Sequence, residues 1–515
     1  MIRVWARTLP ERFGGRLVFT ALIVVLVVAL VVRVVAAVNG YDFRHGSDAD
    51  QYERLAAGIF HGDGFGIPGS QNPYDFAPGA PYFAAVIYWL VGDVDPTAAR
   101  IGMAVAGTLA VLIVFFIGRR LGGPVAGLIG AALAAVYPAP IFYTGLLSSE
   151  PIAMLTVAGA MLAFLWAADD GRAAWAWLVP GVLFGLTAYL RPEYLLLTAL
   201  FALLALVVMW RRRGLVRGVL AAAAIVVGFA VVIAPWTIHV SNDLDRFVPV
   251  STGGGKALFI GTYLPGDGLH EGVKQHLLHQ TRGGPPIPEE RLRRIPMNPL
   301  LDRVASKYPE LPRDTALQRI GRENLVRYAT EQPVAFARMM LGKIAHMWHG
   351  AGDPSYTVAG SAFHYIVLAL GLCGLALLAV RRRWEVWPIA LLLVGISLIG
   401  GLLLAGVRRN LPVMPIVLAL AGVAASAALT WFLARRSGKE PVHGGKTDHS
   451  IREQADPVPQ RGVREREGTG DGPTGAHPDG GESRRLQEAP AGSSEGDQGA
   501  GQGSRTTHQE TRREG

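Results

Sequence analysis

The apolar residues of this chain fall in long runs that charged residues seldom interrupt. A helical run of about 20 apolar residues matches the hydrocarbon thickness of a lipid bilayer. Runs of this kind occupy residues 17–38, 97–118, 122–143, 151–168, 174–190, 194–210, 217–236, 361–380, 386–405 and 411–434. The apolar segment Pro81–Leu90 is too short to cross, which favours an interfacial or re-entrant helix. The pattern predicts an all-α polytopic membrane protein with about ten transmembrane helices.

Arginines cluster at the ends of these runs. They lie at Arg3, Arg7, Arg12 and Arg16, at Arg119–Arg120, at Arg211–Arg213 with Arg217, at Arg381–Arg383 and at Arg435–Arg436. With ten crossings, all of the clusters fall on one side, which the positive-inside rule makes cytoplasmic. We therefore expect both termini in the cytoplasm. The first run exceeds a typical signal-peptide core and has no small-residue cleavage site after it, so we expect it to be retained.

The remaining segments divide the chain into four predicted parts. Residues 1–239 form an N-terminal transmembrane module, whose first external loop, 40–96, holds eight Asp or Glu against two Arg. Residues 240–355 form a small external domain of mixed secondary structure, in which Pro333 separates two helices. Residues 356–436 form the C-terminal transmembrane helices, and 437–515 form a cytoplasmic tail.

Composition adds three points to this picture. The tail contains no Phe, Trp or Tyr and is rich in Gly, Glu, Arg and Ser, so it cannot bury enough apolar surface and is predicted to be disordered. The formal charge of +9 does not indicate nucleic acid, because Lys and Arg crowd the cytoplasmic loops of membrane proteins. The single cysteine, Cys373, lies in an apolar run, which excludes an intrachain disulfide and a cysteine zinc site.

Ionisable residues stand at the external membrane boundary in four places. Asp48 follows the first run by a few residues and is either a solvated loop acid or a general base held at the membrane surface. Glu150 follows Ser148 and Ser149 and precedes Pro151, a pattern typical of a helix N-terminus. Capping does not exclude a site role, because the carboxylate would still point into the external cavity.

The other two places bring arginines to the same boundary. Arg191 and Glu193 flank Pro192 in a very short connection, where they either pair with each other or take part in a site. Arg408 and Arg409 lie on the external side against the usual charge bias, unless the number of spans is different. An external arginine pair suits a phosphate, because guanidinium binds its oxygens bidentately.

Two familiar signals are incomplete. Gly253-Gly254-Gly255-Lys256 superficially resembles a phosphate loop, but Ala257 follows the lysine and the upstream glycine spacing is absent. The histidines show no tight ligand spacing, so no metal site is predicted, and a divalent metal requirement stays open.

Six motifs in order resemble bacterial members of the dolichyl-phosphate-mannose protein mannosyltransferase superfamily, glycosyltransferase family 39, with the membrane GT-C fold. Aminoarabinose transferases of lipid A are relatives of this family. The motifs are Asp48-Ala49-Asp50-Gln51-Tyr52 with Gly62-Asp63-Gly64-Phe65, Ala77-Pro78-Gly79-Ala80-Pro81, Leu190-Arg191-Pro192-Glu193, Ala234-Pro235-Trp236 with Phe247–Thr252, Glu331-Gln332-Pro333 through Lys343, and Arg408-Arg409-Asn410-Leu411-Pro412. The last is similar to the family's Arg-Tyr-Arg-Leu-Pro, with Arg409 and Asn410 in place of Tyr and the second Arg.

The resemblance implies a multi-pass enzyme of the bacterial cytoplasmic membrane that moves a sugar from a polyprenyl-phosphate donor to a cell-envelope acceptor, with inversion. Asp48 takes the place of the family's first-loop catalytic acid. Asp50, Tyr52, Glu150 and Glu193 are supporting candidates, and Arg191, Arg408 and Arg409 are candidates for binding the donor phosphate. No cofactor is implied, and membrane lipids are partners.

Two other functions fit the same pattern. A transporter or flippase for a lipid-linked substrate would place ionisable residues at mid-membrane depth and show an inverted repeat. A non-catalytic envelope scaffold would leave the boundary arginines unexplained.

Overall fold

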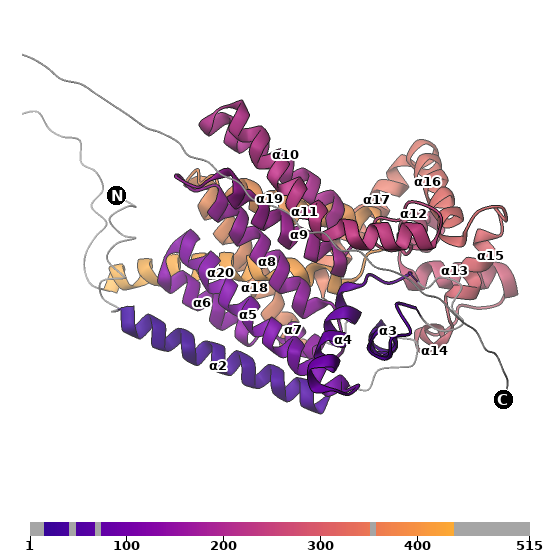
Figure 1. Cartoon of the computed structure of the whole chain (residues 1–515), viewed down its shortest axis with the longest axis horizontal. Coiled ribbons are helices and arrows are strands. Elements are labelled where there is room, and N and C mark those ends of the chain that lie inside the picture. The colour runs from indigo at the N-terminus through magenta and orange to yellow at the C-terminus, as the bar shows by residue number, and fades with distance from the viewer. Residues whose placement is uncertain (1–14, 41–47, 67–73, 351–356, 437–515) are drawn as a thin grey trace, which may run out of the picture. The chain divides into compact units, whose positions relative to one another are not determined.

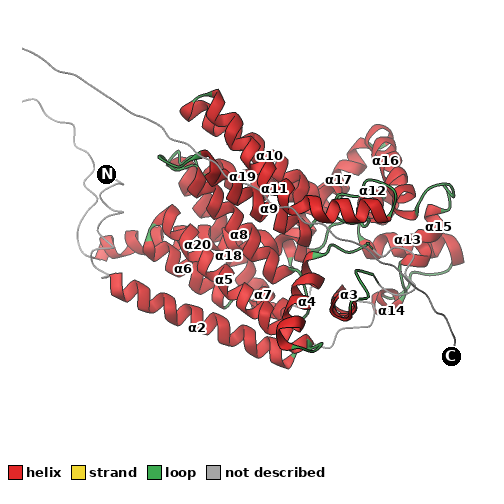
Figure 2. Cartoon of the chain, in the orientation of Figure 1, coloured by secondary structure: helices red, strands yellow, loops and turns green. Residues whose placement is uncertain are grey.

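The computed structural model describes residues 15–40, 48–66, 74–350 and 357–436. These residues form helices joined by loops, with no strand among them (Figure 2). The chain divides into two compact units, Met1–Val442 and His443–Gly515. The second unit lies outside the described residues, as do Arg3, Arg7 and Arg12. The predicted disorder of the tail, 437–515, therefore concerns residues that the structure does not describe.

Helices occupy all ten predicted spans, although not all of them have full length. Seven segments are long and apolar enough to cross a membrane, or eight if one bent pair is counted as a span. The seven are α2 (Gly15–Asn39), α5 (Pro96–Gly122), α8 (Glu150–Ala167), α10 (Tyr194–Arg213), α11 (Leu215–Asp243), α18 (Val358–Val380) and α20 (Met414–Arg436), the last together with the short helix η3 (Val407–Val413). The all-α polytopic architecture is therefore confirmed.

Three predicted spans are shorter or broken. Residues 122–143 form α6 (Pro124–Ala135) and α7 (Pro138–Thr144), which are bent by 51°. Residues 174–190 form η1 (Ala174–Trp177) and α9 (Leu178–Leu190), and α19 (Val386–Leu402) has 17 residues. The short apolar helix predicted at Pro81–Leu90 is α4 (Gly79–Val91).

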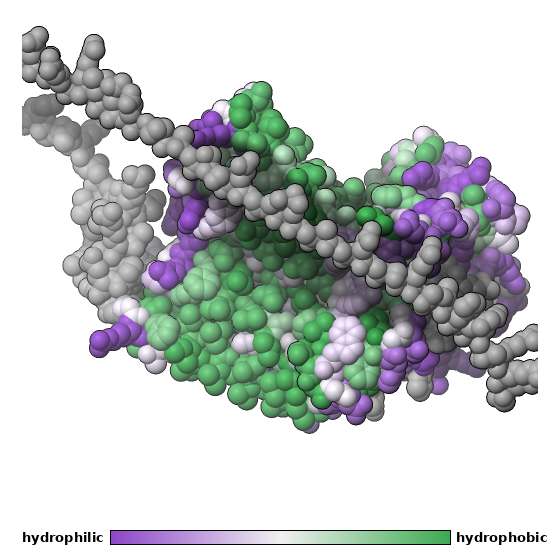
Figure 3. Space-filling view, in the orientation of Figure 1, coloured by the Kyte–Doolittle hydropathy of each residue, from purple (hydrophilic) through white to green (hydrophobic). Residues whose placement is uncertain are grey.

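Close helix packing holds the bundle together around α20. This helix contacts α5, α6 and α18 (Figure 1), and its residues from Met414 to Ala424 are all buried. A Cβ added at Gly422 would lie 2.2 Å from the backbone oxygen of Ala126, so the two backbones meet where only glycine fits. Small residues let helices approach in lipid, where apolar burial between helices provides little driving force. The surface over α2 and its neighbours is hydrophobic (Figure 3).

Arginines gather at one end of this bundle. Arg120, at the end of α5, forms an ion pair with Asp169 with an N–O distance of 2.5 Å, and Arg213 pairs with Asp170 at 2.7 Å. Arg212 stacks on Trp384, with 4.4 Å between the guanidinium carbon and the ring centre. Clusters that are far apart in the sequence thus share one end, as the sequence analysis expected.

The segment after α11 forms a helical layer at the other end of the bundle, whose surface is hydrophilic (Figures 1 and 3). Its helices are α12 (Gly254–Thr262), η2 (Leu264–Gly266), α13 (His270–Arg282), α14 (Glu289–Arg294), α15 (Asn298–Ala305), α16 (Arg313–Glu331) and α17 (Pro333–His349). Helices α12, α13, α15 and α16 share a small core that includes Phe259, Leu301 and Leu317. Pro333 separates α16 from α17 as predicted, whereas the expected mixed secondary structure is replaced by helices throughout the described part of residues 240–355.

Candidate functional site

Six of the eight predicted site residues meet in one cluster of charges, the site cluster. Asp48 accepts a hydrogen bond from Arg408, Arg191 donates to Glu150 at 2.6 Å, and Arg409 donates to Glu193 at 3.0 Å. A fourth ion pair, with an N–O distance of 3.7 Å, joins Arg408 to Glu150 and links the first two pairs.

Helix ends place these side chains. Asp48 is the first described residue of α3 (Asp48–His61), and Glu150 is the first residue of α8. Arg191 and Glu193 flank Pro192 between α9 and α10, and both cluster arginines of η3 lead into α20. The charges therefore stand at helix ends and in short connections, and not within the long apolar helices.

The local interpretations offered by the sequence are revised at two points. Arg191 and Glu193 do not pair with each other, since each finds its partner on a different helix. Neither serine before α8 caps it: Ser149 makes no side-chain capping bond, and the Ser148 hydroxyl donates to the Tyr143 carbonyl at 2.8 Å. Glu150 is therefore held mainly by its ion pairs with Arg191 and Arg408. Its favourable interaction with the N-terminus of α8, where it stands in the first turn, is secondary.

Burial divides the site cluster into an inner and an outer part. The side chain of Glu150 is 2% exposed and that of Arg191 is 9% exposed. The side chains of Asp48 and Arg408 are 38% and 39% exposed. The inner pair fixes the geometry, while the outer pair can be reached by a substrate and by water.

The charges around Asp48 favour its ionised form. Arg408 is the main cause that lowers the pKa of this carboxyl group, burial acts in the opposite direction, and Lys256 and Arg191 lower it further. Tyr52, one turn along α3, has a pKa raised to about 12, mainly by burial and then by the charge of Asp48. Tyr52 therefore stays protonated near neutral pH and can donate a hydrogen bond but not accept a proton.

Glu193 has its pKa lowered although burial alone would raise it, because Arg409 and Arg191 favour the carboxylate.

Asp50 lies apart from the cluster. It pairs with Arg54 one turn along α3 at 3.2 Å and lines a surface cavity of about 540 Å³ together with Glu53 and Arg100. Two residues along a helix correspond to a rotation of about 200°, so Asp48 and Asp50 point in different directions.

Three residues near the site were not predicted from the sequence. Lys256 of α12 acts electrostatically on Asp48, and the glycine run before it was the available signal. Lys343 is fully buried, and its amine donates to the Gly261 carbonyl at 2.6 Å. Asn410, which stands where the family pattern has arginine, is also buried and donates to the Met347 carbonyl at 2.9 Å, so it ties η3 to α17.

Among the described residues, no group of three or more His, Cys, Asp or Glu side chains could hold a metal ion.

Comparison with known families and structures confirms the resemblance. A family model described as dolichyl-phosphate-mannose-protein mannosyltransferase matches residues 75–239. This range includes Glu150, Arg191 and Glu193, but neither Asp48 nor Arg408. A sequence comparison with curated proteins gives no match.

Among solved structures, the apo oligosaccharyltransferase of Archaeoglobus fulgidus is similar, with 15% identity and a TM-score of 0.52 over 83% of this chain and 52% of that chain. AglB from the same organism, in complex with an inhibitory peptide and a dolichol-phosphate, has 14% identity and a TM-score of 0.50 over 86% and 53%. ArnT from Cupriavidus metallidurans, bound to undecaprenyl phosphate, has 17% identity and a TM-score of 0.39 over 76% and 77%. The chain thus spans about half the length of the archaeal enzyme. The comparisons confirm the GT-C fold and support a glycosyltransferase.

Proposed function

We propose that this protein is an inverting glycosyltransferase that moves a sugar from a polyprenyl-phosphate donor to a cell-envelope acceptor. In this proposal it works at the external face of the bacterial cytoplasmic membrane, with both termini in the cytoplasm. Residues 1–239 and 356–436 form the membrane part, and residues 240–355 select the acceptor. The AglB complex supports the donor class, since a protein of the same fold binds a dolichol-phosphate.

The observation that carries the proposal is the accessible pair of Asp48 and Arg408. The buried pair of Glu150 and Arg191 holds this pair in place, because Glu150 also pairs with Arg408. Transfer from a lipid phosphate needs a base for the acceptor hydroxyl and a cation for the departing phosphate. Both groups stand here at the end of apolar helices, where a lipid headgroup lies. Arg191 and Arg409 add positive charge beside Arg408.

The pairing also suggests an order of events. With Arg408 bound to it, Asp48 is a weak base, because the guanidinium favours the carboxylate over the carboxylic acid. A donor phosphate competes for the guanidinium, since phosphate oxygens accept the same bidentate hydrogen bonds. Donor binding therefore frees lone pairs of Asp48 for the acceptor.

In the transfer step, the acceptor oxygen forms a bond to C1 of the sugar from the face opposite the phosphate. The bond between C1 and the phosphate oxygen breaks, and the polyprenyl phosphate leaves with the electron pair, stabilised by Arg408. Asp48 takes the hydroxyl proton and later releases it to water, which its exposure permits. Base catalysis of this kind contributes about 10²–10⁴-fold in rate.

A purified-protein assay tests the proposal. Donor lipids extracted from the membrane are incubated with the protein and an envelope fraction, and mass spectrometry follows sugar transfer and release of polyprenyl phosphate. We expect Asp48→Asn to lower the transfer rate by about 10²–10⁴-fold. Asp50→Asn is the matched control, because Asp50 lies on the same helix but pairs with Arg54, and it should stay near the wild-type rate. Full transfer by Asp48→Asn would refute the role of Asp48.

A further inference from the structure

The surface cavity lined by Asp50 is not used by the proposed reaction. It has a volume of about 540 Å³ and lies between α3 and the start of α5, so we call it the α3–α5 cavity. Asp48 begins the same helix as Asp50 but points in a different direction, because the two residues are about 200° apart around the helix. Ligand sites in proteins have volumes of about 300–1,000 Å³, so the α3–α5 cavity is large enough for a ligand of its own.

Among the described residues, four charged side chains line this cavity, and two of them form a pair. Asp50 and Arg54 stand one turn apart on α3 and form an ion pair with an N–O distance of 3.2 Å. Glu53, on the same helix, has no hydrogen bond or ion pair with any described residue. Arg100 of α5 has no carboxylate partner there either. The four charges therefore sum to zero, and one carboxylate and one guanidinium group remain open to a ligand.

Neutral groups hold Arg100 in place. Its Nε donates to the Ala37 carbonyl at 2.9 Å, and its Nη2 donates to the Thr97 hydroxyl at 2.9 Å. Its Nη1 makes no hydrogen bond within the part of the chain that the structure describes. These bonds fix the guanidinium beside the end of α2 and leave a donor for an anion. Burial raises the pKa of the Glu53 carboxyl group and Arg100 opposes this shift, so the two groups lie within electrostatic reach of each other.

The α3–α5 cavity stands at the level of the lipid head groups. Helix α2 has 25 residues and is about 37 Å long, whereas the hydrocarbon core of a bilayer is about 30 Å thick. Ala37, which binds Arg100, lies in the last turn of this helix and therefore near the edge of the core. At the end of α4, Leu90 and Val91 are 78% and 55% exposed, as expected for side chains that face lipid. Val94 of the cavity follows three residues later, so an apolar tail of a bound ligand can reach the bilayer.

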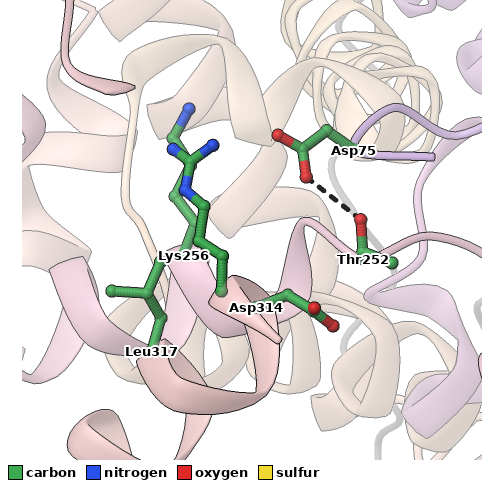
Figure 4. A pocket seen from close by; sticks show the side chains of 6 residues that line it. Asp75, Thr252, Lys256, Asp314 and Leu317 are labelled. Carbon is green, nitrogen blue, oxygen red and sulfur yellow. Dashed lines mark hydrogen bonds between the residues drawn. The ribbon is translucent and has the colours of Figure 1, made fainter. Parts of the chain in front are cut away.

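A pocket between α12 and α16 is a useful contrast, because its charges serve the fold (Figure 4). Its volume of about 10 Å³ holds at most one water molecule. Both of its carboxylates have partners, since Asp75 accepts a hydrogen bond from Thr252 at 3.0 Å and Asp314 pairs with Arg246 at 2.7 Å. The α3–α5 cavity differs from this pocket both in its volume and in its open carboxylate.

We infer that the α3–α5 cavity binds the head group of a membrane glycerophospholipid that carries both an ammonium and a phosphate group, as phosphatidylethanolamine does. Glu53 binds the ammonium group, and Arg100 binds the phosphate, whose oxygens suit a guanidinium. The head group has no net charge, which matches the lining of the cavity, and its acyl chains extend into the bilayer. The site is separate from the proposed reaction, because it lies on a different side of α3 from Asp48. A lipid bound there connects α3 to α5.

Binding of two lipids to the purified full-length protein in detergent tests the inference. Phosphatidylethanolamine carries both charges, whereas phosphatidylglycerol has the same phosphate without the ammonium group. We expect the wild type to bind phosphatidylethanolamine about 10-fold more tightly, in the range for one charge-assisted hydrogen bond. Glu53→Gln should remove this preference, mainly by weakening the binding of phosphatidylethanolamine. Arg100→Gln should weaken the binding of both lipids, because both carry the phosphate.

Asp63→Asn is the matched control. Asp63 is exposed just after α3, has no ion pair with a described residue and does not line the cavity. Its substitution removes the same unit of negative charge, so the preference for phosphatidylethanolamine should persist. Melting temperatures of all variants show whether they are folded. Glycerophosphoethanolamine, the same head group without acyl chains, should compete only at far higher concentrations than the lipid.

Three results would overturn the inference. The first is equal affinity of the wild type for the two lipids, or a folded Glu53→Gln variant that keeps the preference. The second is competition by glycerophosphoethanolamine at the concentration of the lipid, which would indicate a site for a soluble zwitterion. The third is displacement of bound phosphatidylethanolamine by envelope oligosaccharides, which would assign the cavity to an acceptor glycan.

Discussion

Arg33 and Arg408 are two arginines in the membrane part of the chain, and they lie in opposite kinds of surroundings. Arg33 of α2 is 1% exposed and contacts no carboxylate among the described residues. Its guanidinium donates to the carbonyls of Ala29, Ala134 and Ala135 at 3.1, 2.9 and 3.0 Å. Arg408 is 39% exposed and binds Asp48 and Glu150.

The partners of Arg33 explain its presence. Helix α6 ends at Ala135. In a continuous helix the N–H of residue 138 would donate to the carbonyl of Ala134, but residue 138 is Pro138, which has no N–H group. Carbonyls left without a donor are costly in lipid, so Arg33 completes the break between α6 and α7. It is a structural cation, and it does not support the transporter interpretation, which requires charges along a path through the membrane.

Exposure and the kind of partner therefore separate the two roles better than depth in the membrane. An arginine surrounded by carbonyls stabilises one helix arrangement. An arginine that shares an accessible carboxylate can exchange it for a substrate anion. The following predictions test that distinction.

Of the variants that compare the two arginines, Arg408→Gln should have the largest effect. Loss of the guanidinium should lower the transfer rate about 10²–10³-fold, the range for removal of one group that stabilises developing negative charge. The melting temperature should change little, because Asp48 is open to water and Glu150 keeps Arg191. Rate and melting temperature are measured on the same preparation. A large loss of stability with a normal transfer rate per folded molecule would contradict this prediction. It would show that Arg408, like Arg33, has a structural role.

Arg33→Met should have the opposite profile. Two carbonyls at the end of α6 lose their donor, at a cost of about 1–3 kcal/mol each, so the melting temperature should fall clearly. Transfer per folded molecule should stay near the wild-type value. Arg16→Met on the exposed part of the same helix is the control and should leave stability unchanged. A stable but inactive Arg33→Met protein would contradict the structural role.

Lys343 extends the comparison to a buried cation outside the spans. Burial lowers its pKa from 10.5 to about 7 in the folded protein. Between pH 7 and 10.5 the unfolded chain binds more protons at Lys343 than the folded protein does. The free energy of unfolding should therefore rise with pH, by at most about 1.4 kcal/mol per pH unit. Below pH 7 the Lys343 amine is protonated in the folded protein too, so the full cost of burying its charge lowers the free energy of unfolding. Melting temperatures of the wild type and Lys343→Met, compared from pH 6 to 11, should show this rise only in the wild type, and parallel curves would contradict it.

The smallest effect concerns the space around Arg33. A Cβ at Gly107 would lie 3.0 Å from the Arg33 Nε atom, so Gly107→Ala should shift the guanidinium and cost about 1 kcal/mol of stability. At Gly159 a Cβ would meet only the Leu183 side chain, at 3.6 Å, and alanine should be neutral or stabilising there. Equal melting temperatures for the two variants would show that the Arg33 position is not restrained.

Much of the membrane part could be predicted from the sequence, because apolar runs of the right length have few alternatives to helices in lipid. The break at Pro138 depends on a donor from α2, more than 100 residues away in the sequence, which a local pattern does not show. The helices of residues 240–355 carry weaker patterns, since their small core is shared among short segments.

For the site, the sequence identified the charged residues but not their pairing. Asp48 and Asp50 are equivalent acids in a linear reading, and only the helix directs one toward Arg408 and the other toward Arg54. Arg191 and Glu193 look like a local pair, yet Pro192 turns them toward different helices. Lys256 lacked a complete motif, and its electrostatic effect on Asp48 depends on the fold, which a linear pattern does not show.

The central claim is that Asp48 and Arg408 act as one unit in sugar transfer, and a double-mutant cycle tests it most directly. Transfer rates are measured for the wild type, Asp48→Asn, Arg408→Gln and the double variant, all shown to be folded. We expect the double variant to lose little more than the more damaged single variant, because groups in direct contact that serve one step are not independent. Losses that multiply, or a single variant with full transfer, would contradict the claim.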